Sequence, residues 1–376
     1  MLRRMYVDNF KCFLNFECKF DNINLILGTN GSGKSSVFDV LRNLQEVVTG
    51  RSPIKLFQES TLTRWQQRDV QVFELEVEGN GGIYTYRLEI EHEIGEDKRR
   101  IRLERVTFDG KFLYSAELDD LRLTVHLYKD DTRAGPTFGG DWSQSGLAFL
   151  GDLPENTKIT WLKKWFRENL FCLQIDPLHI KAMADITELN LDTCALNYVG
   201  WYRHRISSDM NATVRLRDLL QDMYDDFGGL TLDQQGTNVV HLMANLGVRE
   251  ETKGKPVFVR YSFGELSDGE RTLIVLYTLL QLMSDSDTTL CLDEPDNYLA
   301  LAEIQPWLLN LRDRIDSSGS QAVLISHHPE LINNLAVGCG LVFERDKNGP
   351  VRVKPFPVDT GQECLTPSEV VARGLE

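Results

Sequence analysis

Apolar residues recur with two different periods along this chain, and the period changes from one region to the next. Apolar and polar residues alternate in 72–77 and 84–90, which is typical of strands with one buried face. Residues 23–27 are mostly apolar and end at Gly28, as expected for a more deeply buried strand. Residues 35–47 instead carry apolar side chains at helical spacing. The chain is therefore predicted to be a mixed α/β protein.

The first third of the chain is dominated by predicted strands. Two short ones precede the apolar run, at 4–10 and 16–20. Residues 70–115 form a predicted antiparallel meander, in which Asp109-Gly110 is a strong hairpin signal. We therefore expect residues 1–115 to form an N-terminal lobe with an antiparallel β-sheet.

The middle of the chain, 116–256, has a weaker pattern and is predicted to be a partly helical insertion. Its first part, to residue 160, contains glycine- and proline-marked loops. A short helix is expected at 161–169, followed by a strand at 170–175. Residues 184–226 read as mainly helical, and 230–246 as strands.

Alternating strands and helices return in residues 257–376, which we expect to form a C-terminal lobe of parallel strands. Helices are predicted at 272–283, 301–315 and 329–336, and strands at 290–292, 322–325, 341–343 and 351–353. The segment Thr366-Pro367-Ser368-Glu369 is a capping box with proline at the first helical position, so a last short helix should follow it.

Composition narrows the class of protein without naming its task. The 376 residues carry a formal charge of −15, which argues against strong non-specific attraction to nucleic acid or to an anionic membrane. Seven cysteines include no C-x-x-C pair, so neither a zinc site nor a disulfide framework is indicated. No stretch approaches the roughly 18 apolar residues of a membrane span, and the N-terminus lacks an apolar signal core. A cytoplasmic protein is expected.

The most specific motif lies between the apolar strand and the first helix. It matches G-x-x-x-x-G-K-[ST] and continues with a second serine, as Gly28-Thr29-Asn30-Gly31-Ser32-Gly33-Lys34-Ser35-Ser36. Such a loop directs backbone N–H groups at phosphates beside a helix N-terminus. Lys34 would reach the β- and γ-phosphate oxygens, and Ser35 would offer its hydroxyl to Mg²⁺.

A second motif supplies carboxylates at the end of an apolar strand, in Leu290-Cys291-Leu292-Asp293-Glu294-Pro295. Asp293 is expected to orient Mg²⁺ beside Ser35. Glu294 would polarise a water for attack on the γ-phosphate. Alone, an Asp-Glu-Pro segment is also a common turn, and its pairing with the glycine loop makes the functional interpretation the stronger one.

A third motif, Ser267-Asp268-Gly269-Glu270, precedes an apolar helix. It can be read as an ordinary helix N-cap or as a second phosphate-binding helix N-terminus. In the second case Ser267 and Gly269 would bind the γ-phosphate of another subunit, because the chain's own glycine loop occupies the opposite side of its nucleotide. Such a site requires a homodimer that sandwiches two nucleotides.

A histidine follows the predicted strand at 322–325. A neutral imidazole at His327 could hydrogen-bond the γ-phosphate. His328 is a competing candidate, and a structural helix-start histidine is the plainer alternative.

These motifs, in this order, resemble the head of ABC-type ATPases, and the long insertion is similar to the branch containing RecF, the structural-maintenance-of-chromosomes (SMC) proteins and the OLD nucleases. The resemblance covers 1–60 and 257–345, and it implies a Mg²⁺-dependent ATPase that binds ATP. It also implies roles for residues outside the motifs above. Lys11 and Phe13 would lie against adenine. Gln174 would be the Q-loop glutamine that contacts the metal and the attacking water, with Gln58 as the alternative. Asp296 would be the D-loop aspartate that acts across the dimer.

The chain also departs from that branch. No segment sustains coiled-coil heptads, there is no C-x-x-C hook, and the chain ends too soon after His327 for a Toprim nuclease domain. We therefore expect a separate effector or nuclease subunit, as in compact ATPases of bacterial anti-phage systems. The signature reads Ser-Asp-Gly-Glu, which is closer to DNA-repair proteins than to transporters.

The leading hypothesis is an ATPase that controls a DNA- or RNA-directed partner in DNA repair or anti-phage defence. A non-hydrolysing ATP-binding scaffold and a transporter's nucleotide-binding subunit are the alternatives. Direct nucleic-acid contact is a weaker hypothesis for the basic run 98–105, where a solvated hairpin strand is favoured. For 201–205, a helix face packed on its own core is favoured over base stacking.

Overall fold

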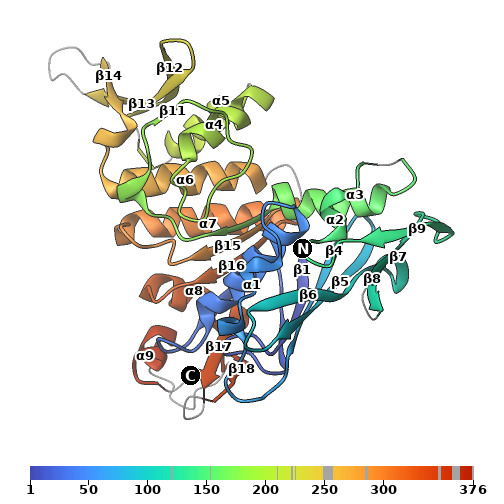
Figure 1. The fold of residues 1–376 in the computed structure, drawn as a ribbon. Helices are drawn as coiled ribbons and strands as arrows, with labels where there is room; N and C mark the ends of the chain where they lie inside the picture. The colour runs from blue at the N-terminus through green and yellow to red at the C-terminus, as the bar shows by residue number, and fades with distance from the viewer. Residues whose placement is uncertain are drawn as a thin grey trace.

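A computed structural model describes residues 1–119, 122–152, 154–209, 211–221, 223–224, 226–248, 257–283, 287–345, 349–357 and 365–374. The fold combines two large sheets with a smaller third one (Figure 1). In Figure 1 the smallest sheet lies at the opposite end of the molecule from the C-terminus.

The first sheet is antiparallel and has eight strands in the order β2-β1-β4-β5-β6-β7-β8-β9. Its strands are β1 (Leu2–Asp8), β2 (Phe16–Lys19), β4 (Val70–Gly79), β5 (Gly82–Glu93), β6 (Lys98–Phe108), β7 (Lys111–Asp119), β8 (Arg122–Tyr128) and β9 (Ala134–Gly140). The predicted strands at 4–10, 16–20 and 70–115 are thus present. The sheet also continues past residue 115 through β8 and β9, in the region whose pattern was weakest.

The second sheet brings together strands from distant parts of the chain, in the order β10-β15-β16-β3-β17-β18. They are β3 (Ile23–Leu27), β10 (Leu170–Leu173), β15 (Thr289–Asp293), β16 (Gln321–Ile325), β17 (Gly340–Arg345) and β18 (Val351–Pro355). All neighbours are parallel except the β17–β18 hairpin. Because β3 lies between β16 and β17, the strand that precedes the glycine loop belongs to the same sheet as the Asp-Glu strand.

The third sheet comprises β11 (Met183–Ala184), β12 (Phe227–Gln235), β13 (Val239–Val248) and β14 (Val257–Ser262). Because β14 begins at Val257, this sheet crosses the predicted boundary between the insertion and the C-terminal lobe. Helices α4 (Tyr198–Ser208) and α5 (Ala212–Gln221) accompany it. The prediction for 184–226 is therefore confirmed in its second half, since helix begins only at Tyr198.

The remaining helices surround the two large sheets. They are α1 (Lys34–Val48), α2 (Gly146–Phe149), α3 (Thr157–Lys164), α6 (Asp268–Leu282), α7 (Leu301–Ser318), α8 (Pro329–Cys339) and α9 (Pro367–Ala372), with a π-helical turn at Trp165–Asn169 and short 3₁₀ turns at Ile54–Leu56, Glu59–Thr61, Pro177–His179 and Phe263–Glu265. The capping box predicted before the last helix is present, with Thr366 as its N-cap.

The second sheet separates two hydrophobic cores because its side chains alternate between its faces. In β15, Cys291 packs toward α1 and the antiparallel sheet, whereas Leu290 and Leu292 pack toward α6 and α7. In β16, Val323 and Leu324 divide in the same way. The second sheet is thus the middle layer, and the ends of its strands form an edge that both cores hold in place.

A buried carboxyl group links the antiparallel sheet to the segment before α2. Glu104 is fully buried in β6 and accepts hydrogen bonds from the hydroxyls of Tyr86 (3.1 Å), Tyr114 (3.0 Å) and Ser145 (2.5 Å) and from the backbone N–H of Gly146 (3.0 Å). Burial raises the pKa of Glu104, and these hydrogen bonds oppose the shift. The hydrogen-bonded Glu104 carboxyl group is therefore expected to stabilise the lobe that contains the antiparallel sheet.

Replacing Glu104 by leucine should destabilise the protein by about 3 kcal/mol, because the buried donors lose their acceptor. Glu104→Gln, which keeps an acceptor oxygen, should be less damaging. Since the folded-state pKa is raised, the folded state binds the proton more tightly, and this contribution to stability falls as the pH rises through the unfolded and then the folded pKa. Urea unfolding across this pH range should show that dependence in the wild type and less of it in Glu104→Gln.

Candidate nucleotide-binding site

The glycine loop connects the end of β3 to the first turn of α1, as its motif predicted. Gly28, Gly31 and Gly33 all have positive φ, at 141°, 78° and 96°. At Gly33, a β-carbon would come within 2.8 Å of the Cys12 sulfur, so this position requires glycine for space as well as for conformation. The loop can therefore fold tightly against the helix N-terminus, where backbone N–H groups favour an anion.

A cavity of about 430 Å³ lies over this loop. It is lined by Lys11, Cys12, Asn30, Gly31, Gly33, Lys34, Ser35, Ser36, Asp293, Glu294, Ile325, His327 and Arg345. The β1–β2 turn, the glycine loop, the end of β15, the end of β16 and the end of β17 thus meet at one place. The tertiary structure brings together three motifs, the first and last of which are almost 300 residues apart in sequence.

Lys34 extends back over its own loop. Its ammonium group donates to the carbonyl of Gly28 (2.7 Å) and to that of Thr29 (3.2 Å). Desolvation lowers the pKa of Lys34, and the negative charges of Asp293 and Glu294 oppose this shift. The lysine therefore lies between the phosphate loop and the two carboxylates, in a position suited to a polyanion.

Asp293 ends the buried strand β15 and has only 7% of its surface exposed. Burial raises its pKa, against the effect of a hydrogen bond from the Ser35 hydroxyl. A hydroxyl and a carboxylate side by side are hard oxygen ligands of the kind that Mg²⁺ prefers. Within the described residues no cluster of three or more His, Cys, Asp or Glu could hold a metal, so Mg²⁺ would also need water or phosphate ligands.

Glu294 follows at once and has a backbone conformation that is uncommon for a non-glycine residue, with φ of 49°. Its N–H donates to the carbonyl of Ile325 (2.8 Å), which ties the turn to the end of β16. The carboxylate consequently lines the cavity rather than continuing the alternation of the strand.

The two histidines after β16 have different environments. His327 is exposed and lines the cavity, where Ile325 of β16 also contributes. His328 is the N-cap of α8, and its Nδ1 accepts a hydrogen bond from the N–H of Glu330 (3.1 Å). The geometry therefore favours His327 as the residue that faces a nucleotide and gives His328 a structural role.

The signature segment lies outside this cavity. None of the described residues 263–271 is among its lining residues. Ser267 is exposed at the N-cap of α6 and forms a capping box with Glu270, whose N–H donates to the Ser267 hydroxyl (3.3 Å). The motif is thus an N-cap in its local structure, and its outward position leaves it available to a second molecule.

Gly269 allows close approach between the signature helix and the turn after Asp293-Glu294. A β-carbon on Gly269 would lie 2.8 Å from the carbonyl oxygen of Tyr298. Tyr298 itself is half exposed and has φ of 73°. The signature helix therefore packs on the turn after β15 in the same subunit.

Asp296, which is predicted to act across a dimer, has a contact within its own subunit, and its role across the dimer stays a prediction. Its side chain is largely buried and bonds to Ser326, at the end of β16. Burial raises the pKa of Asp296, and the Ser326 hydrogen bond opposes that shift. In this structure the residue links the turn to the residue that follows β16 in its own subunit, whereas the neighbouring Asn297 and Tyr298 are exposed.

The two predicted adenine contacts also have different environments. Lys11 lines the cavity and forms an ion pair with Asp39 of α1 (2.7 Å). Phe13 has no exposed surface, and its ring stacks on Phe16 with centroids 4.2 Å apart. Phe13 is therefore a core residue here and presents no face to a base.

Arg345 was missed by sequence reasoning, because nothing in its local sequence distinguishes it from other strand-end arginines. It ends β17, beside β3, and its guanidinium donates to the carbonyl of Gly31 (2.9 Å). The same group lies 5.4 Å from the ring centroid of Trp65. Only the strand order brings this cation to the glycine loop.

Neither candidate for the Q-loop glutamine lines the cavity. Gln174 is exposed directly after β10, whose last residue, Leu173, is in register with Leu292 of β15. Gln174 thus follows its strand at the same level as Asp293. Gln58 precedes the 3₁₀ turn Glu59–Thr61. The role of Gln174 remains a prediction, which the pairing of β10 with β15 supports.

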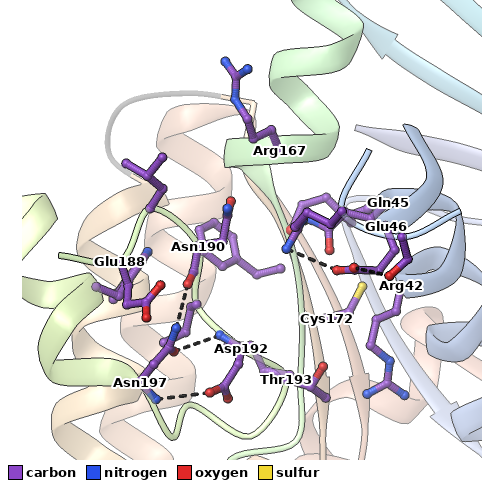
Figure 2. A pocket seen from close by; sticks show the side chains of 18 of the residues that line it. Arg42, Gln45, Glu46, Arg167, Cys172, Glu188, Asn190, Asp192, Thr193 and Asn197 are labelled. Atoms are coloured by element: carbon purple, nitrogen blue, oxygen red, sulfur yellow. Dashed lines mark hydrogen bonds and ion pairs between the residues drawn. The ribbon is translucent and has the colours of Figure 1, made fainter. Parts of the chain in front are cut away.

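A larger cavity of about 660 Å³ lies between α1 and the insertion (Figure 2). In Figure 2, Arg42, Gln45 and Glu46 of α1 face Asn190 and Asp192 across it. Its lining contains four arginines (Arg42, Arg51, Arg167 and Arg205) and four carboxylates (Asp39, Glu46, Glu188 and Asp192). The charges balance, and no residue of the glycine loop contributes, so this is not the phosphate site.

The basic run in β6 is largely neutralised by neighbouring carboxylates. Ion pairs join Lys98 to Glu96, Arg99 to Asp97, Arg100 to Glu91, Arg102 to Glu89 and Arg105 to Glu117. Trp201 has no exposed surface and Tyr202 almost none. These observations favour a solvated strand and a packed helix over nucleic-acid contacts at either place.

The antiparallel lobe, the sheet with parallel strands and the cavity at its carboxyl edge define an ABC-type ATPase head. The sequence of residues 1–348 matches the protein family described as the RecF/RecN/SMC N-terminal domain, and the chain belongs to this family. No curated protein matches it. No described helix is long and apolar enough to cross a membrane.

Two solved structures of heads are similar. An SMC head bound to the C-terminal winged-helix domain of ScpA is 13% identical, with a TM-score of 0.53 over 94% of this chain and 98% of that one. The SMC head domain from Thermotoga maritima is 14% identical, with a TM-score of 0.47 over 95% of this chain and 99% of that one. The similarity to the ScpA-bound SMC head supports the fold of this chain and no more specific property.

Gly269→Ala should destabilise the protein by about 1–3 kcal/mol, because the added methyl group meets the backbone of Tyr298. Gly264→Ala is a matched control, since its β-carbon would make an ordinary 3.5 Å contact with Ala182. Urea unfolding of both variants measures the difference. Equal stabilities would show that the helix and the turn are not in tight contact.

Proposed function

We propose that the protein is a Mg²⁺-dependent ATPase whose two copies sandwich two ATP molecules and thereby control a nucleic-acid-directed partner. The observation that carries the proposal is the separation of the signature from the cavity. One chain supplies the phosphate loop, both carboxylates and His327, yet Ser267 is exposed outside the cavity. A second copy is the natural source of the missing helix N-terminus, since a two-fold arrangement would complete both sites at once.

The residues of the cavity fit the chemistry of phosphoryl transfer. Lys34 and the backbone N–H groups of the loop would bind the β- and γ-phosphates, and Ser35 with Asp293 would hold Mg²⁺, which neutralises phosphate charge. Glu294 would accept a hydrogen bond from the attacking water and orient it. His327 would contact the γ-phosphate from the end of β16, and Gln174 would approach from β10.

The family and the third sheet support a proposal for the biological setting. RecF and SMC proteins give the family its name, and the described residues of 183–262 form a small sheet with two helices rather than a long coiled coil. We propose DNA repair or anti-phage defence, with a separate effector or nuclease subunit. Because Arg100 and Arg105 of β6 are already paired with carboxylates, we propose that the partner, and not this head, contacts DNA or RNA. Membership of this family does not support a transporter subunit.

Glu294→Gln should reduce ATP hydrolysis by about 100-fold or more while leaving ATP binding intact, because the side chain keeps its shape and loses its charge. ATP should then hold the variant as a dimer, which light scattering would detect. If the wild type binds ATP and dimerises but neither protein hydrolyses it, the chain is a non-hydrolysing scaffold.

Mixing two inactive variants tests the shared site. Lys34→Ala retains the signature, and Ser267→Arg retains the phosphate loop, so a mixed dimer contains one intact composite site. Random mixing should restore about a quarter of the sites, and ATPase activity should rise accordingly. No recovery, with both variants folded and able to exchange subunits, would show that the signature does not act across a dimer.

A further inference from the structure

The turn after β15 holds the Glu294 carboxylate through a side chain that no motif above includes. The amide Nδ2 of Asn297 donates to Glu294 Oε2 (2.8 Å), and the Asn297 N–H donates to the Glu294 carbonyl (3.2 Å). Glu294 has left-handed backbone geometry, which persists only where surrounding contacts maintain it. Two hydrogen bonds from one residue thus restrain both the backbone and the carboxylate of Glu294.

We propose that Asn297 is a positioning residue for hydrolysis, which fixes the Glu294 carboxylate so that its other oxygen faces the attacking water. This inference rests on the proposed role of Glu294. An ionised carboxylate accepts hydrogen bonds through two oxygens. Asn297 engages Oε2, which leaves Oε1 for the water and restricts rotation of the group.

The exposed position of Asn297 indicates that its hydrogen bond to Glu294 does not serve mainly to stabilise the fold. Its side chain is exposed, so the amide satisfies no buried group. Its flanking residues anchor the turn instead, since Asp296 bonds to Ser326 and the Tyr298 carbonyl lies against Gly269. Asn297 is therefore free to act on Glu294 without being needed for the fold.

The same turn gives the proposed dimer a route to the carboxylate. The signature helix packs on Tyr298, one residue from Asn297. A shift of α6 as it engages the partner's nucleotide would be transmitted through this backbone contact to the turn that carries the amide. Hydrolysis at one site would then depend on closure at the other.

Asn297→Asp is the sharpest variant, because it is nearly isosteric, lacks the N–H donor and places a second carboxylate beside Glu294. Asn297→Ala removes the contact without adding charge. Both should lower kcat roughly 10–100-fold, with KM, ATP affinity and Tm nearly unchanged. ATP-bound dimers should also last longer, as expected when hydrolysis alone is slowed.

Asn334→Asp is the matched control. Asn334 on α8 is also exposed, and its Nδ2 donates to Glu330 Oε1 (2.8 Å), so the same Asn–Glu contact is broken away from the cavity. Its kcat should equal that of the wild type. If the Asn297 variants keep wild-type kcat, or lose ATP binding and stability instead, the positioning role is wrong.

A double-mutant cycle connects the effect to Glu294. In a Glu294→Gln background, Asn297→Asp should cause little further loss, because both changes remove the same function. Additive losses would contradict action through Glu294. Activity retained by Glu294→Gln would overturn the proposed catalytic role itself, and with it this inference, whereas a wild-type rate in Asn297→Asp beside an inactive Glu294→Gln would overturn the inference alone.

Discussion

The site depends on the placement of β3 between β16 and β17 in a sheet that also contains β15. Parallel neighbours end at the same edge, so the glycine loop, Asp293 and His327 emerge together. The hydrogen bond between Ser35 and Asp293 joins the first turn of α1 to the end of β15 directly. Any change of strand order would scatter groups that have no other reason to meet.

Two cores stabilise that edge from opposite faces. One packs the antiparallel lobe and α1 against the sheet, and the other packs α6, α7 and α8. The helix that follows the phosphate loop thus packs in one core and the signature helix packs in the other. Such a layered arrangement suits a protein whose proposed work is to close two copies on nucleotide, because each lobe can act as a rigid body.

Tertiary contacts add detail to several of the sequence-based assignments. Asp296 bonds to Ser326 of its own subunit, and Phe13 is part of the core. Arg345 entered the site because the strand order brings it to the glycine loop, and Asn297 because the turn after β15 directs its amide back to Glu294. For Arg345 and Phe13 the local sequence is compatible with several environments, and long-range packing selects one.

The candidate chemistry can be read from local sequence, because the glycine spacing, the strand-ending Asp-Glu pair and the serine cap before an apolar helix each follow from short-range rules. Most strands with alternating patterns are also predictable, because the residues of a half-buried strand differ between its exposed and buried faces. The strand order, the extension of the first sheet to Gly140 and the direction of each side chain were set instead by the packing of the folded chain. Those features depend on contacts between residues far apart in the chain, and no local pattern encodes which distant surface a side chain will meet.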